Sequence, residues 1–349
     1  MGERTATLAE IAREAGVSVP TVSRVLNGRP GISERKRDEI ERLLELRGYE
    51  RRKPRRETPL IDFVTVGLET QWSLQLLRGA QAEAARAGAD FVVTATEGLP
   101  AGAPDWLERL RSRGSDGIVV VVSELAQDAR AELSRLQVPV VLIDPVGTDT
   151  ESYVTVAAAD WLGARDATQH LLDLGHERIG FVTGPLHLEC HQDRLDGYYS
   201  ALGRRGITRD PDLVCVGDSL VSGGETYGGK LLDLEERPTA ILSGSDEQAY
   251  GIYLAARKRG LSIPEDLSVV GFDDVDLARW ISPQLTTIHQ PLAGMAATAT
   301  RLVLALSRGE EVSNRRVQLA SELVIRDSTA PPRAIVRHPA QVKVAKNPV

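Results

Sequence analysis

From residue 60 onward, short apolar runs alternate with segments of helical periodicity, and this alternation constrains the fold more than any other feature. Eight runs are typical of β-strands: 61–66, 89–96, 117–122, 138–144, 178–184, 212–217, 240–245 and 267–273. Helical patterns lie between them, for example over 74–87 and 161–174. Apolar strands separated by helices predict parallel sheets covered on both faces. Eight such units over residues 60–328 favour two doubly wound α/β subdomains over one.

The first 49 residues have a different, all-helical pattern. Leu8 and Ile11 lie at helical spacing in residues 7–14, and Gly16 suits the end of that helix. Ser18 is a good N-cap for a second helix, and Pro20 is tolerated in its first turn. A third helix is expected over 33–47. Its inward-facing residues are predicted to be Ile40, Leu43, Leu44 and Leu46.

Two helices joined by a glycine-containing turn and supported by a third predict a helix-turn-helix domain. The second helix of that motif enters the DNA major groove, where its side chains contact base edges and phosphates. The residues predicted to contact DNA are Thr7, Ser18, Val19, Pro20, Thr21, Ser23, Arg24 and Asn27. The alternative is that this helix is simply an amphipathic member of a small bundle.

The charge distribution agrees with a DNA partner for this head. Residues 1–57 contain 14 Lys and Arg against 10 Asp and Glu, a net charge of +4 that leaves −11 for the remainder. Residues 50–59 predict an extended basic linker, because Pro54 and Pro59 disfavour a helix. Its basic residues are Arg51, Arg52, Lys53, Arg55 and Arg56. We expect them to follow phosphates or a narrow minor groove, or else to form a solvated tether.

Residues 7–49, TLAEIAREAGVSVPTVSRVLNGRPGISERKRDEIERLLELRGY, resemble the head of the lac-repressor family. The body resembles the same family as far as Ser328, as in LLDLGHERIGFVTGP, AILSGSDEQAYGIYLAARKRGLSIPEDLSVVGFDD and SPQLTTIHQP. The resemblance implies a homodimeric transcriptional repressor of a palindromic operator, with a body like a periplasmic sugar-binding protein. The linker departs from the family pattern, in which a short hinge helix carries a leucine. Here no leucine lies between Tyr49 and Leu60.

The expected domain organisation follows from these patterns. A helix-turn-helix domain at 1–49 and a basic linker at 50–59 precede a ligand-binding domain at 60–328 and a disordered tail at 329–349. In the ligand-binding domain, residues 60–158 with 291–310 are expected to form one subdomain, and 159–290 with 312–328 the other. The alanine-rich helix 293–307 is expected near the dimer interface or in the core.

Ligands bind doubly wound sheets at the carboxyl ends of the strands, so residues directly after strands are candidates. Asp273 follows the last strand run, and its carboxylate could accept two sugar hydroxyls. Asp273 and Arg194 also match the aspartate and arginine that the family uses on ligands. Ser245 and Asp246 follow the preceding run, with Ser245 where many members have asparagine. The alternatives are a helix cap for Asp273 and a surface salt bridge for Arg194.

Aromatic residues make up only 4% of the chain, which gives the positions of the tryptophans weight. Trp72, Trp161 and Trp280 follow strand runs or lie where the cleft is expected. The apolar face of a sugar ring stacks on such side chains. Their positions therefore favour a sugar or oligosaccharide ligand, with packing as the alternative role.

Other chemistries are disfavoured. His187, Cys190, His191 and Asp193 lie together in one apparent loop, without the two spaced pairs of a zinc site, so ligand contact is favoured over metal. Phosphate-loop, serine-hydrolase and zinc-protease motifs are absent, so we expect neither an enzyme nor a cofactor. The two cysteines, and the lack of both an 18-residue apolar run and a signal-peptide pattern, favour a cytoplasmic protein without membrane contact.

The sequence therefore predicts a DNA-binding repressor whose operator affinity is controlled by a small effector, most simply a sugar inducer. Ligand binding would close the two subdomains and misplace the paired heads on the operator. One alternative is a regulator that needs a purine-type corepressor. The other is a sugar-binding transport component, against which the basic helical head argues.

Overall fold

The structure is a computed structural model that describes residues 8–26, 31–47, 58–96, 104–121, 133, 136, 138–145 and 153–333. The chain divides into two compact units, a head of residues 1–57 and a body of residues 58–349, and each is described by itself. The predictions for Thr7, Asn27 and the five basic linker residues fall outside the described residues.

The head contains three helices, α1 (Leu8–Glu14), α2 (Val19–Leu26) and α3 (Glu34–Leu46), as the sequence predicts. Gly16 has a φ of 63°, the left-handed conformation that ends α1. The helices enclose one small core formed by Ile11, Ala12, Ala15, Val22, Val25, Ile40 and Leu44. Leu46 is 74% exposed, so its expected inward position is wrong. It is the last residue of α3, beyond the stretch that packs on the other two helices.

The first sheet of the body has the order β11-β5-β4-β3-β1-β2, and all its strands are parallel. They are β1 (Leu60–Thr65), β2 (Asp90–Ala95), β3 (Gly117–Val121), β4 (Val140–Ile143), β5 (Val154–Ala158) and β11 (Arg316–Leu319). The helices of this subdomain are α4 (Gln71–Arg86), α5 (Pro104–Arg113) and α12 (Leu292–Ser307). Helix α12 packs against α4 and across β3, β4 and β5, so it is a core helix of the subdomain.

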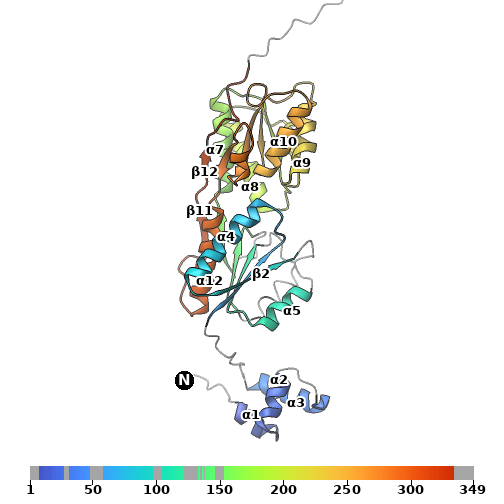
Figure 1. Cartoon of the computed structure of the whole chain (residues 1–349), viewed down its shortest axis with the longest axis vertical. Coiled ribbons are helices and arrows are strands. Elements are labelled where there is room, and N and C mark those ends of the chain that lie inside the picture. The colour runs from blue at the N-terminus through green and yellow to red at the C-terminus, as the bar shows by residue number, and fades with distance from the viewer. Residues whose placement is uncertain are drawn as a thin grey trace, which may run out of the picture. The chain divides into compact units, whose positions relative to one another are not determined.

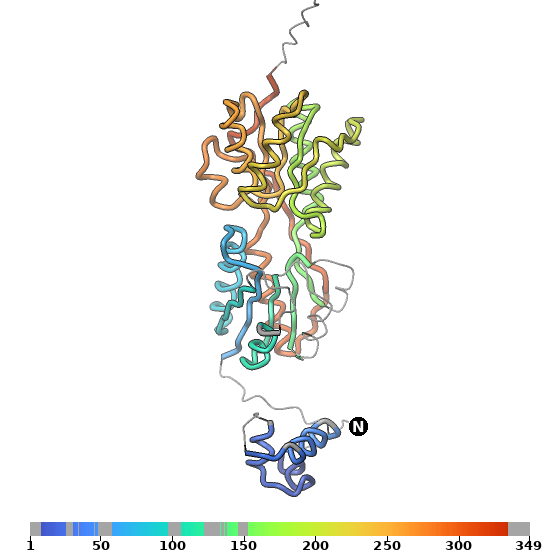
Figure 2. The backbone as a smooth tube through the Cα atoms, turned by 90° about the vertical axis from the view of Figure 1, so that its right-hand side faces the viewer, coloured from blue at the N-terminus to red at the C-terminus, as the bar shows by residue number. Residues whose placement is uncertain are grey.

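The second sheet has the order β12-β10-β9-β8-β6-β7, with β12 antiparallel at one edge. Its strands are β6 (Ile179–Thr183), β7 (Val214–Val216), β8 (Ala240–Ser243), β9 (Ser268–Asp273), β10 (Thr286–His289) and β12 (Glu322–Val324). Its helices are α7 (Asp160–Asp173), α8 (Glu189–Arg204), α9 (Val221–Leu232), α10 (Asp246–Lys258) and the short α11 (Leu277–Trp280), with a 3₁₀ turn at Pro211–Leu213. Figures 1 and 2 show the two lobes of the body end to end.

Helices cover both faces of the second sheet, as near-continuous apolar strands require. Phe181 and Leu242 belong to the core on the α7 and α8 side. Their strand neighbours Val182 and Ile241 belong to the core on the α9 and α10 side. Since successive strand residues point to opposite faces, the two cores lie on opposite sides of one sheet. The doubly wound prediction is confirmed.

The division of the body differs from the expected one at its carboxyl-terminal end. Residues 312–328 were assigned to the second subdomain, but β11 pairs in parallel with β5 of the first sheet, and only β12 joins the second. The chain thus passes between the lobes three times. The expected tail also starts too early, because Thr329 and Ala330 bond to His170 and His176. In the described ranges, no helix has the length and apolar character needed to cross a membrane.

Candidate functional site

A cavity of about 270 Å³ lies between the two subdomains, where the carboxyl ends of both sheets meet. Residues after β1 and β4 line it from the first subdomain, and residues after β8 and at the end of β9 from the second. The turn that opens α4 adds further lining residues, Thr70, Trp72 and Ser73. The cavity therefore lies where the doubly wound fold predicts a ligand.

Two carboxyl groups, one from each subdomain, line this cavity. Each has one oxygen that accepts no hydrogen bond from the described residues. Asp144 follows β4 and Asp273 ends β9, and the buried Oδ1 of each has no hydrogen-bond partner among the described residues. Burial raises the pKa of Asp144 to about 7 and that of Asp273 well above its usual value. Both residues have positive φ, 46° and 117°, which is costly for a side chain other than glycine. A ligand donor would satisfy both oxygens.

Arg194 brings a fixed positive charge to the same cavity. It is only 4% exposed. Its Nε donates to Asp160 Oδ1 at 2.7 Å, its Nη1 donates to the carbonyl of Gly244 at 2.6 Å, and its guanidinium carbon lies 3.9 Å from the centre of the Phe272 ring. Burial alone would lower the pKa of Arg194, but the carboxylate of Asp160 outweighs it and the pKa is raised. The guanidinium is held in place with Nη2 left over to donate to a ligand.

In the head, the exposed residues of α2 are the ones predicted to contact DNA. Val22 and Val25 are buried, whereas Ser18, Pro20 and Arg24 are exposed and Val19 is 41% exposed. Thr21 and Ser23 are half-buried, and Ser18 Oγ lies 2.9 Å from Thr21 Oγ1. The outer face of α2 is thus free of acidic residues and ends in a basic one.

Comparisons with known proteins cover both units. Residues 7–51 match the model of bacterial regulatory proteins of the lacI family, and residues 168–329 match a periplasmic binding protein-like domain. The chain is 32% identical over 332 residues to the HTH-type transcriptional repressor CytR of Escherichia coli K12, covering 94% of this chain and 97% of that protein. The chain belongs to the lacI family of bacterial regulatory proteins.

Solved structures agree with this assignment. A complex of the transcriptional regulator CelR with cellobiose has a TM-score of 0.72 at 29% identity, covering 93% of this chain and 99% of that one. The lac repressor dimer bound to operator and the anti-inducer ONPF has a TM-score of 0.71 at 28% identity, covering 94% and 100%. This lacI-family chain therefore shares both the head and the two-lobed body of known transcription regulators.

Of the seven residues predicted to bind the effector, the structure brings four to the cavity: Trp72, Arg194, Ser245 and Asp273. Trp161 and Trp280 do not line it. The Trp161 ring lies 5.4 Å from the guanidinium carbon of Arg165, and Trp280 is 70% exposed on α11. The predicted grouping of three tryptophans around the ligand is therefore corrected to Trp72 alone, because proximity to a strand end does not fix the direction of a side chain.

Asp246 also lies outside the cavity. It is fully buried, and its two oxygens accept hydrogen bonds from Thr287 Oγ1 at 2.5 Å and from the backbone N–H of Val275 at 2.9 Å. Its predicted role as a ligand contact is replaced by a structural one. Ser245 lines the cavity, but its hydroxyl caps α10 by accepting from Gln248 N and donates to the carbonyl of Ser219. The hydroxyl is thus engaged within the protein.

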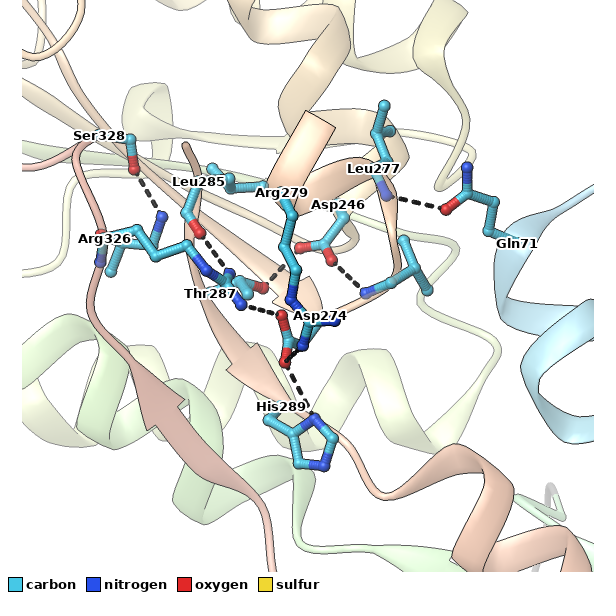
Figure 3. A network of polar contacts seen from close by, with 12 residues as sticks. Gln71, Asp246, Asp274, Leu277, Arg279, Leu285, Thr287, His289, Arg326 and Ser328 are labelled. Atoms are coloured by element: carbon cyan, nitrogen blue, oxygen red, sulfur yellow. Dashed lines mark hydrogen bonds and ion pairs between the residues drawn. The ribbon is translucent and has the colours of Figure 1, made fainter. Parts of the chain in front are cut away.

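Asp274, the residue after Asp273, has a structural role. It accepts hydrogen bonds from the side chains of Arg326, Arg279 and His289 (Figure 3). Arg326 in turn donates to the carbonyl of Leu285 at 2.7 Å. This network ties β9 and β10 to the chain that follows β12.

The sequence reasoning missed several lining residues. Asp144 ends an apolar run just as Asp273 does, and the rule that selected Asp273 could have found it. The segment 189–193 is not an irregular loop, because α8 begins at Glu189 and presents Cys190 and His191 to the cavity. Burial lowers the pKa of His191 well below its usual value, so the ring is neutral, and its Nε2 lies 3.0 Å from Ser219 Oγ. The described residues contain no cluster suited to a metal ion.

Proposed function

We propose that this lacI-family protein is a transcriptional repressor whose affinity for a palindromic operator is controlled by an uncharged sugar or oligosaccharide bound between the subdomains. The observation that carries the proposal is the pair of unpartnered carboxyl oxygens, one on each subdomain, in a cavity that also holds Arg194 and Trp72. Sugar hydroxyls donate to carboxylates and accept from a guanidinium, while a ring face stacks on tryptophan.

The charge of the cavity supports an uncharged ligand over an anionic one. Five acidic residues line it, Glu69, Asp144, Asp218, Glu247 and Asp273, against a single arginine. That arginine is already paired with Asp160. A phosphorylated or carboxylated sugar would meet acidic side chains that outnumber the one arginine, which disfavours an anion in a buried site.

The control of DNA binding follows from the position of the cavity. A ligand that bonds both Asp144 and Asp273 contacts two subdomains at once, so it stabilises one of their arrangements over others. Only this difference in affinity between arrangements can alter operator binding. We propose a homodimer on two half-sites, as in the dimer of the lac repressor on its operator. A cytoplasmic location and the absence of catalysis follow from this role.

The test measures operator binding by fluorescence anisotropy at fixed salt, with a labelled palindrome from upstream of the protein's own gene and a scrambled control. Cellobiose, ribose, other mono- and oligosaccharides, a phosphorylated sugar and a purine are then added. Release by an uncharged sugar is expected, and Asp273→Asn should abolish it while leaving operator binding intact. Strengthening by the purine alone would replace the proposal with a corepressor mechanism.

A further inference from the structure

In the first turn of α4, Gln71 makes two hydrogen bonds to the opposite subdomain. The backbone N–H of Gln71 donates to Glu247 Oε1 at 2.9 Å. Its side-chain Oε1 accepts from the backbone N–H of Leu277 at 2.9 Å, as Figure 3 shows. Gln71 belongs to the first subdomain, and Glu247 and Leu277 to the second. Gln71 therefore joins the two lobes through two hydrogen bonds.

Both bonds satisfy backbone groups that a helix cannot satisfy by itself. Gln71 is the first residue of α4, so its N–H has no partner within that helix. Glu247 supplies the acceptor from the other subdomain, and its negative charge suits the positive end of α4. Leu277 is likewise the first residue of α11, whose cap residue Asp276 makes no side-chain capping hydrogen bond and instead pairs with Arg78 of α4 at 3.6 Å. The two subdomains therefore cap each other's helices.

The bridge is continuous with the effector cavity. Glu247 lines the cavity, as do Thr70 and Trp72 on either side of Gln71. Gln71 itself does not line it. A ligand that contacts Trp72 or donates to Glu247 therefore acts on the turn and the carboxylate that form the bridge, without touching Gln71.

We infer that this bridge is the contact through which effector occupancy biases the arrangement of the subdomains, with Gln71 as a positioning residue and Glu247 as the group that senses the ligand. The inference rests on the proposed function, because it assumes that an effector occupies the cavity. Each bond joins groups of different subdomains, so a change in their arrangement breaks it. Loss of one such bond lowers the equilibrium constant that favours the present arrangement of the subdomains by about three- to tenfold.

Two variants distinguish the two hydrogen bonds of the bridge. Gln71→Ala removes the side-chain bond to Leu277 and keeps the N–H that Glu247 accepts. Gln71→Pro removes both, and proline is favoured at the first position of a helix. Thr70, which precedes it, has φ −98° and ψ 149°, which is compatible with a following proline. Glu235→Ala, an exposed acid of the second subdomain, is the matched control.

The decisive readout is the pair of affinities, for operator without sugar and for the releasing sugar (cellobiose is the first probe). For an inducer, a shifted arrangement moves the two affinities in opposite directions, by about threefold in Gln71→Ala and up to about tenfold in Gln71→Pro. A merely structural role would lower both affinities together and lower the melting temperature. That result, or two unchanged affinities, would overturn the inference.

Hydrogen exchange of the full-length protein distinguishes failure of the bridge from failure of the proposed function. Exchange of the Leu277 N–H should be faster in both Gln71 variants and unchanged in Glu235→Ala. If no sugar releases the operator from the wild-type protein, the proposed function fails. In that case a shifted operator affinity and faster Leu277 exchange in the Gln71 variants would still support the bridge. If Leu277 exchange and operator affinity both match wild type, the bridge does not exist in solution.

Discussion

Asp273 and Asp274 are consecutive residues of the same type, yet they belong to two different regions of the body. Asp273 lines the cavity with an unbonded oxygen, whereas Asp274 accepts from Arg326, Arg279 and His289 in the network behind the cavity. Asp144 resembles the former and Asp246 the latter. Four acidic residues thus divide into two pairs. In Asp144 and Asp273 one oxygen has no partner among the described residues, whereas both oxygens of Asp246 and Asp274 accept hydrogen bonds.

The difference shows how a binding site is kept ready for a ligand. Unpartnered buried carboxyl groups cost folding free energy, so they persist only where the surrounding structure fixes them. The bonded pair provides that support: Asp246 holds the chain just after Asp274, at Val275, and Asp274 holds β10 through His289. The network behind the cavity therefore stabilises the backbone on which Asp273 is held open for a ligand.

The largest expected effect comes from breaking the bonded region. Asp274→Ala leaves the nearly buried guanidinium of Arg326 without its carboxylate, and loss of one partner of a buried ion pair costs about 3–5 kcal/mol. We expect a fall of that size in the free energy of unfolding of the body, measured by urea titration. Glu235→Ala should stay within about 0.5 kcal/mol of wild type. An equally small change in Asp274→Ala would contradict a structural role.

Asp273→Asn should weaken sugar binding without weakening the fold, the opposite of Asp274→Ala. The folded body should lose no stability, because the oxygen concerned has no partner among the described residues to lose. Affinity for the releasing sugar should fall by about 1–3 kcal/mol, the usual cost of leaving a buried hydrogen-bonding group without its partner. Isothermal titration calorimetry with the sugar checks this. Retained sugar affinity in Asp273→Asn would remove Asp273 from the site.

The sequence predicts this division only in part. Apolar periodicity was enough for eight strands and the three head helices, because burial against neighbours repeats along the chain. Position at the end of a strand run selected both Asp273, which lines the cavity, and Asp246, which does not. What separates them is the direction of the side chain: Asp246 turns back to Thr287. That direction depends on β10, 41 residues further along the chain.

The contacts between subdomains are harder still to predict from the sequence. Gln71 meets Glu247 and Leu277 across separations of 176 and 206 residues. No local pattern marks a backbone N–H that is capped from another lobe. Similarly, β11 and β12 are short and only half-buried, so their strand patterns are weak, and their assignment to different sheets follows from pairing partners alone.

A smaller effect on sugar affinity is expected from the tryptophan that forms the apolar part of the cavity. Trp72→Ala should weaken sugar binding about three- to tenfold, because it removes a stacking surface from the cavity. Trp280→Ala, on an exposed side chain outside the cavity, is the matched control and should leave sugar affinity unchanged. Calorimetric titration of both variants with the same sugar decides between them. Equal losses would mean that the cavity does not define the sugar site.

The smallest expected effect is a dependence on pH that distinguishes the two neighbouring aspartates. Burial raises the pKa of Asp273 in the folded body, so the folded state holds a proton that the unfolded chain loses above about pH 4. The stabilisation from that proton is present at low pH and is lost as the pH rises through the raised pKa. Asparagine does not titrate.

Asp273→Asn should therefore match wild type at low pH and become relatively more stable as the pH rises from 5 to 8. Urea unfolding of both proteins across that range, without sugar, measures the difference. Asp274→Asn should remain less stable than wild type at every pH in the series, because Arg326 lacks its charged partner throughout. A constant difference for Asp273→Asn would mean that its carboxyl group is ionised in the folded body, and hence that a partner satisfies it in solution.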